Sequence, residues 1–423
     1  MSPRELLIGC LRAAIAEADP RVIVPAHLPV PPKGRTLVVG AGKAAASMAA
    51  AVEAHWPVAA PLEGVVITRH GHGLPTRRIR VVEAGHPVPD EAGEQAAAEI
   101  LARAGALGED DLMLVLVSGG GSALLSLPVE GVSMADLKAL TRSLLASGAP
   151  IQDMNTLRKH LSRIQGGRLA LASRARVHAL VISDVTGDDP THIASGPCSP
   201  DPTTFRDCLD IVSRFGVQPP PSVADHLSKG ARGEVPESAK PGDPGFDRTE
   251  VRVIATARRS LQAASDFLAK HGVKALVLGD SVTGESRDVA GVHASIAREI
   301  RQNGHPWPAP AAIVSGGETT VTIRGSGKGG RCSEFLLSLA IDLDGLPDTW
   351  ALAADTDGID GAETNAGAIA TPDTIARARA AGLDPKSRLA DNDCFGFFSP
   401  LGDLVTTGPT LTNVNDFRVI LVL

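Results

Sequence analysis

The segment Thr36-Leu-Val-Val-Gly40-Ala-Gly42-Lys43-Ala-Ala45 carries the strongest fold signal, because a short apolar run leads through a glycine turn into alanine-rich sequence. This order is typical of a buried strand, a tight turn and the first turn of a helix. Glycines in such a turn let a ligand approach the backbone, and the unpaired N–H groups at a helix start attract anions. Lys43 adds a positive charge to the same turn. We therefore expect Gly42 and Lys43 to belong to an anion site.

Similar short apolar runs recur along the whole chain and alternate with alanine-rich segments. Their apolar residues are continuous, whereas a strand with one exposed face would alternate with polar residues. The sequence therefore predicts an α/β fold with parallel sheets that helices cover on both faces. The predicted strands include residues 36–40, 64–68, 112–117, 179–183, 251–255, 275–278, 311–314, 350–354 and 419–423.

A composition change marks the expected domain boundary. Between Gly230 and Arg248 the chain turns to proline, glycine and charged residues without a helical period. A length of 423 residues allows two or three domains at roughly 150 residues each. We expect a Rossmann-like N-terminal domain over residues 1–240 and a second α/β domain over residues 250–423. Whether the last strand returns to the first domain is left open.

Composition excludes several classes of partner. The 48 acidic residues outnumber the 41 Lys and Arg, and aromatic residues make up only 3% with no Tyr. Nucleic acid is therefore not expected as a partner, because it needs basic patches or aromatic stacking faces. No apolar run approaches the ~18 residues of a membrane span. Five scattered cysteines without a CxxC pair favour the cytoplasm and give no zinc pattern.

Two further glycine loops follow predicted strands. The loop Ser118-Gly119-Gly120-Gly121-Ser122 combines backbone freedom with hydroxyl donors, which suits phosphate binding. The segment Ser315-Gly316-Gly317-Glu318-Thr319 repeats this arrangement in the second half of the chain. Downstream, Arg331 opens a predicted helix, where its planar guanidinium could neutralise phosphoryl charge. All three segments are candidate parts of a phosphate site.

Other charged residues are candidates for clamping or metal binding. Asn155, Arg158 and Lys159 share one predicted helical stretch, which is either a solvated face or a clamp for a carboxylate or phosphate. Four aspartates at strand ends suit magnesium, which takes carboxylate and phosphate oxygens. They are Asp184, Asp188, Asp355 and Asp357. For the later pair, loop capping is an equal alternative.

The identity of a nucleotide stays open at this level. The first turn has the G-x-G-x-x-A shape of a dinucleotide site, but no acid ends the next predicted strand, where Thr68-Arg69-His70 stands. This disfavours NAD and leaves NADP, through Arg69. No segment has the register of a Walker loop. An NADP-dependent reductase and a non-catalytic binder of small anions therefore remain alternatives.

Taken together, motifs over nearly the whole chain resemble the class II glycerate 2-kinases, a family of two α/β domains that has also carried the name hydroxypyruvate reductase. The resemblance rests on segments 39–44, 85–90, 117–123, 155–161, 183–190, 193–197, 315–319, 329–331, 355–361 and 407–416.

The resemblance implies an activity, a place for it and its partners. It implies ATP-dependent phosphorylation of D-glycerate at the 2-hydroxyl, giving 2-phospho-D-glycerate and ADP, in a cleft between the domains. The family's lysine and arginine fall on Lys43 and Arg331. Asp184 is the third catalytic candidate, either holding Mg²⁺ or orienting the hydroxyl. ATP, Mg²⁺ and D-glycerate are then the only expected partners, with no membrane and with a homodimer as one option.

One departure from the family pattern follows Arg331. The family usually continues with Asn and Gln or a similar residue before Glu, whereas Cys332 and Ser333 precede Glu334 here. A cysteine cannot replace the hydrogen bonds of an asparagine side chain. If that side chain touches nucleotide or substrate, nucleotide preference or substrate fit will differ in this protein.

Overall fold

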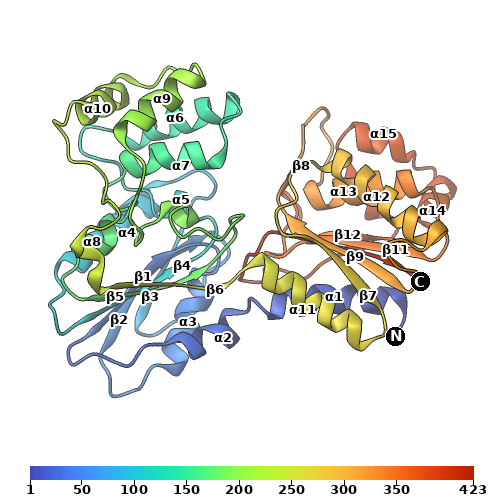
Figure 1. Ribbon diagram of the computed structural model, residues 1–423, viewed down its shortest axis with the longest axis horizontal. Coiled ribbons are helices and arrows are strands. Elements are labelled where there is room, and N and C mark those ends of the chain that lie inside the picture. Colours follow the sequence, from blue (N-terminus) through green and yellow to red (C-terminus); the bar gives the residue numbers. More distant parts are fainter. The chain divides into compact units, whose positions relative to one another are not determined.

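The computed structural model describes residues 1–423, which form two compact units (Figure 1). The N-terminal unit contains Pro20–Ile254. The C-terminal unit contains Met1–Asp19 together with Ala255–Leu423. None of the helices combines the length and apolarity needed to cross a lipid bilayer.

The N-terminal unit is built on a six-stranded sheet of order β3-β2-β1-β4-β5-β6. Neighbouring strands from β3 to β5 are parallel, as predicted. The strand order reverses between β1 and β4, and the carboxyl ends at such a reversal are where open α/β sheets bind ligands. The strands are β1 (Thr36–Ala41), β2 (Leu62–Arg69), β3 (Ile79–Ala84), β4 (Leu112–Val117), β5 (Arg176–Ile182) and β6 (Thr249–Ala255).

Helices cover this sheet and also form a separate group. α3 and α4 lie on opposite sides of the sheet, whereas α6, α7, α9 and α10 gather away from it (Figure 1). This second group has its own apolar core, which includes Leu140, Leu157, Phe205 and Leu227. The helical segments are α2 (Pro20–Ile23), η1 (Val24–His27), α3 (Ala45–His55), α4 (Glu91–Gly105), α5 (Gly121–Leu124), α6 (Met134–Ala146), α7 (Ile151–His160), α8 (Arg168–Leu171), η2 (Ile193–Ser195), α9 (Phe205–Arg214), α10 (Pro221–Ala231) and η3 (Pro244–Arg248).

The C-terminal unit has a six-stranded sheet of order β13-β12-β11-β14-β9-β7. Only β7 and β9 are parallel, and the other four pairs are antiparallel. The expectation of a parallel sheet is therefore wrong for this unit. β14 is buried along its whole length, which shows that continuous apolarity reports coverage of both faces and not strand direction. The strands are β7 (Lys274–Gly279), β9 (Ala311–Gly317), β11 (Thr349–Asp355), β12 (Gly367–Ala370), β13 (Leu404–Val405) and β14 (Asp416–Val422), with a separate pair, β8 (Gly284–Glu285) and β10 (Thr319–Thr320).

Helices on both faces complete the C-terminal unit. α1 packs on α11 at one face, where Leu7, Leu11 and Leu261 share a core with Phe417, and α12 and α13 cover the other face. α1 begins with a capping box between Ser2 and Glu5. The helices are α1 (Pro3–Ala16), α11 (Ala257–Lys270), α12 (Ser286–Asn303), α13 (Arg331–Leu343), α14 (Thr374–Ala380), α15 (Pro385–Ala390) and α16 (Cys394–Phe398).

The two units differ from the expected domains, residues 1–240 and 250–423, in two places: at the N-terminus of the chain and at the boundary near residue 250. α1 belongs to the C-terminal unit, because its apolar face is buried against α11. β6 is hydrogen-bonded into the N-terminal sheet, so the division falls between Ile254 and Ala255. The last strand, β14, lies between β11 and β9 at the centre of the C-terminal sheet.

Buried histidines make stability depend on pH. Burial lowers the pKa of His160 in α7 and of His293 in α12. The unfolded chain then binds more protons than the folded chain, so stability is present above pH ~6.5 and is lost as the pH falls below it. We expect the free energy of unfolding in urea to be lower at pH 5.5 than at pH 7.5. The free energy of unfolding is expected to change by at most about 1.4 kcal/mol per pH unit for each histidine.

His293→Gln is expected to reduce this pH dependence, and the exposed His305→Gln serves as the matched control. Equal stability of the wild-type protein at the two pH values would contradict the linkage.

Candidate functional site

Two glycine turns meet at the carboxyl ends of β1 and β4. The backbone N–H of Lys43 donates to the carbonyl of Gly119 at 2.8 Å, and that of Ala44 donates to Ser118 Oγ at 3.0 Å. Gly42 has φ +145°, and a Cβ there would lie 2.1 Å from Ser118 Oγ. The turns can touch in this way only if position 42 carries no side chain.

Two of the consecutive glycines in the second turn, Gly120 and Gly121, are each required for a different structural reason. Gly120 has φ +80°, and a Cβ there would lie 2.9 Å from the His86 ring and 3.5 Å from Cγ of Lys43. The side chains of Lys43 and His86 therefore lie against the backbone at Gly120. A Cβ at Gly121 would lie 2.5 Å from Cβ of Ala194. The predicted phosphate loop is thus in direct contact with the lysine turn.

A chain of hydrogen bonds links this loop to α7. Ser195 Oγ bonds to Ser122 Oγ at 2.9 Å and to Asn155 Oδ1 at 3.1 Å. Arg158 Nη1 donates to the same Asn155 oxygen at 3.2 Å. The structure therefore brings together Ser122, Asn155 and Arg158, which the sequence had proposed as site residues in two separate segments.

Ser195 is a candidate site residue to which the sequence analysis assigned no role, although it lies in the quoted segment 193–197. Ala194 and Ser195 have φ of +50° and +58°, a region that residues with a Cβ rarely adopt. The left-handed conformation costs roughly 1–2 kcal/mol per residue, and such strained positions cluster at functional sites. The sequence does contain one signal for the strained turn at Ser195: the Gly196-Pro197 pair that follows it is typical of a tight turn.

Arg158 and Lys159 have different environments, although they are neighbours in α7. Lys159 is 1% exposed, and its Nζ lies 2.7 Å from Asp201 Oδ1. It therefore belongs to a buried structural ion pair. Arg158 takes part in no ion pair, and burial lowers its pKa. Of the two, only Arg158 has a charge that no acid compensates.

Arg331 begins α13 in the C-terminal unit and is held by three carboxylates. Its Nε, Nη1 and Nη2 lie 2.6, 2.9 and 2.8 Å from Asp416, Glu318 and Asp355. Burial opposes the charge, but the three acids outweigh it and raise the pKa of Arg331. Glu318, predicted to bind phosphate, is a partner of Arg331 here, and its negative charge disfavours direct contact with an anion.

Arg418 is a second arginine in this cluster, which the sequence analysis did not single out. It is 1% exposed in β14, pairs with Asp416, and donates to Thr319 Oγ1 at 3.1 Å. Its guanidinium carbon lies 5.2 Å from the centre of the Phe335 ring. Asp416 thus bridges Arg418 and Arg331. A lone arginine inside the otherwise apolar segment 417–422 was the signal that could have identified it.

The other predicted residues of this unit have structural contacts. A Cβ at Gly317, where φ is +117°, would lie 2.3 Å from the carbonyl of Val282, so the glycine permits close backbone packing. Gly316 lies in β9 beside Phe417 of β14. The N–H groups of Cys332 and Ser333 donate to Asp360, and burial raises the pKa of the Cys332 thiol. The departure from the family pattern at Cys332 therefore lies in the core of the unit.

The four predicted metal ligands fall into two pairs. Asp184 and Asp188 lie in the loop after β5, at the same sheet edge as the lysine turn. In the C-terminal unit, Asp357 donates its N–H to Asp355 Oδ1, while Asp355 Oδ2 accepts from Arg331. No group of three or more His, Cys, Asp or Glu side chains is arranged to hold a metal ion.

The sheet reversal and the two turns define an α/β protein of the doubly wound class with a candidate anion site at the reversal. Residues 6–228 match the model of a domain of unknown function, DUF4147, and residues 311–416 match the MOFRL family. The glycerate 2-kinase of Pyrococcus horikoshii is 40% identical over 92% of this chain and 88% of its own length. An Agrobacterium vitis protein with the provisional name hydroxypyruvate reductase is 48% identical over 100% of this chain and 95% of its own.

A solved structure agrees with these matches. The crystal structure of glycerate kinase from Thermotoga maritima has a TM-score of 0.87 to this chain at 36% identity, over 99% of each chain. The chain belongs to the glycerate kinase family.

Removal of Arg418 is expected to destabilise the protein. Arg418→Met leaves the buried Asp416 without one of its two cationic partners, and breaking a buried ion pair typically costs about 3–5 kcal/mol. Arg301→Met is the matched control, because its pair with Asp348 is exposed and such pairs contribute about 1 kcal/mol or less. Urea unfolding measures both variants. Equal losses in the two would show that Arg418 is no more important than a surface arginine.

Proposed function

We propose that this protein transfers the γ-phosphoryl group of ATP to the 2-hydroxyl of D-glycerate, producing 2-phospho-D-glycerate and ADP. The observation that carries the proposal is the position of Lys43, in a glycine turn that contacts a second glycine turn at the sheet reversal. The names of the Pyrococcus and Thermotoga relatives support the same activity.

Phosphoryl transfer depends mainly on positioning and on electrostatic stabilisation of the transferred group. In the proposed mechanism, Lys43 stabilises charge on the phosphoryl oxygens, and the loop from Ser118 to Ser122 lines the anion site. Both are held by backbone hydrogen bonds, so little reorganisation is needed when charge develops.

Arg331 is the second cation of the proposal. Three of its five N–H donors engage carboxylates, which leaves two for substrate oxygens. Asp416 and Asp355 are buried and fix the guanidinium, whereas the Glu318 side chain is 58% exposed. Glu318 is therefore the partner that an anionic substrate would replace.

The carboxylate of D-glycerate is assigned to Arg158. Its guanidinium has no acidic partner, and Asn155 holds it near Ser122. The geometry of a guanidinium matches a carboxylate through two parallel N–H···O bonds. Binding at Arg158 would fix one end of the acceptor within the N-terminal unit.

Magnesium fits the acids of the loop after β5. Asp184 and Asp188 are half-buried carboxylates at the sheet edge where Lys43 lies, and Mg²⁺ is typically held by one or two carboxylates with substrate phosphates. Bound there, the ion would neutralise charge on the phosphates of ATP. Asp355 fits less well because Arg331 already compensates its charge. In its alternative role, Asp184 would orient the acceptor hydroxyl.

An NADP-dependent hydroxypyruvate reductase is the second candidate. The name of the Agrobacterium relative and the G-x-G-x-x-A shape of the first turn favour it. Phosphoryl transfer gains from a cation such as Lys43 at the transferred group, whereas hydride transfer has no phosphoryl charge to stabilise.

Identification of the product separates the two candidates. The protein is incubated with D-glycerate, ATP and MgCl₂, and in parallel with hydroxypyruvate and NADPH. We expect ATP consumption and a product that enolase accepts directly, which establishes 2-phospho-D-glycerate. NADPH oxidation with ATP untouched would overturn the proposal and favour the reductase.

Lys43→Ala is expected to lower kcat by about 10²–10³ without loss of stability, because one electrostatic contact to the transition state is removed. Lys33→Ala, which removes an exposed lysine, is the control. Steady-state kinetics and thermal melting measure both variants. Turnover of Lys43→Ala near that of the control would remove Lys43 from the mechanism.

A further inference from the structure

We propose that a pocket beside Ser122 binds carboxylic acids with a short apolar body, so that 2-hydroxy acids with an aliphatic side chain compete with D-glycerate for Arg158. The binding follows from the pocket itself. The competition rests on the proposed function, which assigns the carboxylate of glycerate to Arg158.

The pocket lies within the N-terminal unit and has a volume of about 130 Å³. Its apolar wall includes Val88, Leu127, Leu137 and Leu145. Val88 and Leu145 are 61% and 62% exposed, which is unusual for large aliphatic side chains beside a cavity. An aliphatic ligand would remove this surface from water, which is favourable in proportion to the area covered.

The charges on the pocket are all positive. Lys138, Arg142 and Arg158 line it, and none of the lining residues is Asp or Glu. Arg158 is half-buried, and its guanidinium donates only to the neutral Asn155 side chain. Burial of a charge without a counter-ion is costly, so an anion that pairs with Arg158 gains from relieving that cost.

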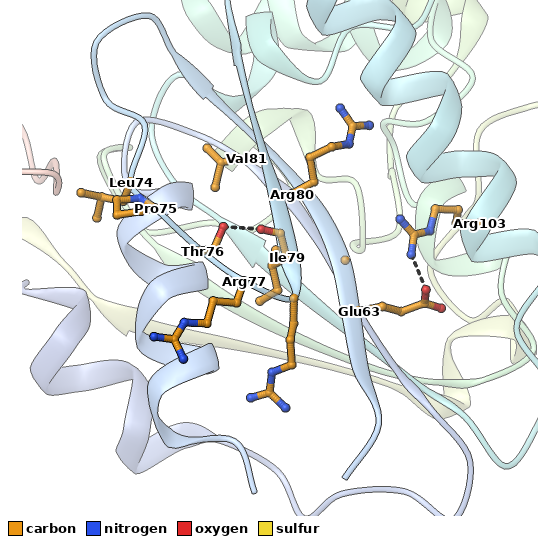
Figure 2. Close-up of a pocket in the computed structure, with 11 residues that line it drawn as sticks. Glu63, Leu74, Pro75, Thr76, Arg77, Ile79, Arg80, Val81 and Arg103 are labelled. Carbon is orange, nitrogen blue, oxygen red and sulfur yellow. Dashed lines mark hydrogen bonds and ion pairs between the residues drawn. The ribbon is translucent and has the colours of Figure 1, made fainter. Parts of the chain in front are cut away.

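A second arginine-rich pocket shows the opposite arrangement. Figure 2 shows Arg103 paired with Glu63, and these atoms lie 2.7 Å apart. In the same pocket, Arg78 pairs with Glu53 and Arg80 with Glu99. These three charges are compensated within the protein, and the fourth arginine of the pocket, Arg77, is exposed, so this pocket offers no half-buried cation without an acidic partner.

The neutral polar groups of the pocket are already engaged, which limits the ligand chemistry. Gln165 donates to the carbonyls of Ser122 and Leu125, and Ser126 Oγ donates to the carbonyl of Ser122. Ser162 Oγ accepts from two backbone N–H groups. The charged donors that remain for a ligand are those of Lys138, Arg142 and Arg158, and Arg158 is the half-buried guanidinium among them. A planar carboxylate suits one guanidinium, whereas a phosphate needs donors on several sides.

The test measures binding by isothermal titration calorimetry on the full chain, without ATP. The probes are 2-hydroxy-4-methylpentanoate, the corresponding uncharged amide, and inorganic phosphate. We expect the acid to bind, the amide and phosphate not to bind in the pocket, and D-glycerate to displace the acid. No binding of the acid, or equal binding of acid and amide, would overturn the proposal.

Three variants locate the site. Arg158→Met is expected to weaken binding of the acid roughly tenfold or more, because a charge-assisted hydrogen-bond pair is lost. Arg163→Met is the matched control, since Arg163 is exposed and outside the pocket. Thr141→Phe fills the pocket from α6 and is expected to abolish binding of the acid while leaving D-glycerate turnover unchanged. It also provides a test if Arg158→Met does not fold.

The outcomes for the pocket and for the kinase are distinguishable. If the acid binds through Arg158 but D-glycerate is not phosphorylated, the proposed function fails and the pocket stands. If D-glycerate is phosphorylated and Thr141→Phe binds the acid as tightly as the wild-type protein, the pocket proposal fails and the function stands.

Discussion

The contact between the two glycine turns is the constraint on which the candidate site depends. The N–H of Lys43 reaches the carbonyl of Gly119, and Gly42 leaves no room for a side chain beside Ser118. This contact couples the ends of β1 and β4 at the sheet reversal. It also places Cγ of the Lys43 side chain against the backbone at Gly120. Larger residues at these glycines would force the turns apart.

Charge compensation differs among the cations that lie wholly or partly inside the protein. Lys159 is paired inside the core with Asp201 and acts structurally. Arg331 is surrounded by carboxylates that orient it, with Arg418 sharing Asp416 from the buried side. Arg158 has only a neutral partner. Because burial of a charge without a counter-ion is costly, an anion that pairs with the half-buried Arg158 would offset part of that cost.

Local sequence signals predicted much of the fold and part of the site. The buried strands, the turns at Lys43 and Ser118, and the helix that begins at Arg331 all follow from short patterns of apolar residues and glycine. The hydrogen-bond chain through Ser195 could not be predicted in this way, because its members come from three separate segments. The burial of Arg418 was also missed, since a strand pattern does not show what faces a polar side chain.

The chain's own pattern was sufficient for the α/β class, the glycine turns and the cations they carry, because each depends on residues within a few positions of one another. Strand direction in the second sheet, the attachment of α1 to the C-terminal unit and the pairing of each charge depended on the tertiary structure. A strand that is apolar along its whole length is buried on both faces, whether it runs parallel or antiparallel to its neighbours. A charged side chain likewise acquires its partner only when distant segments pack together, as Asp416 does between Arg331 and Arg418.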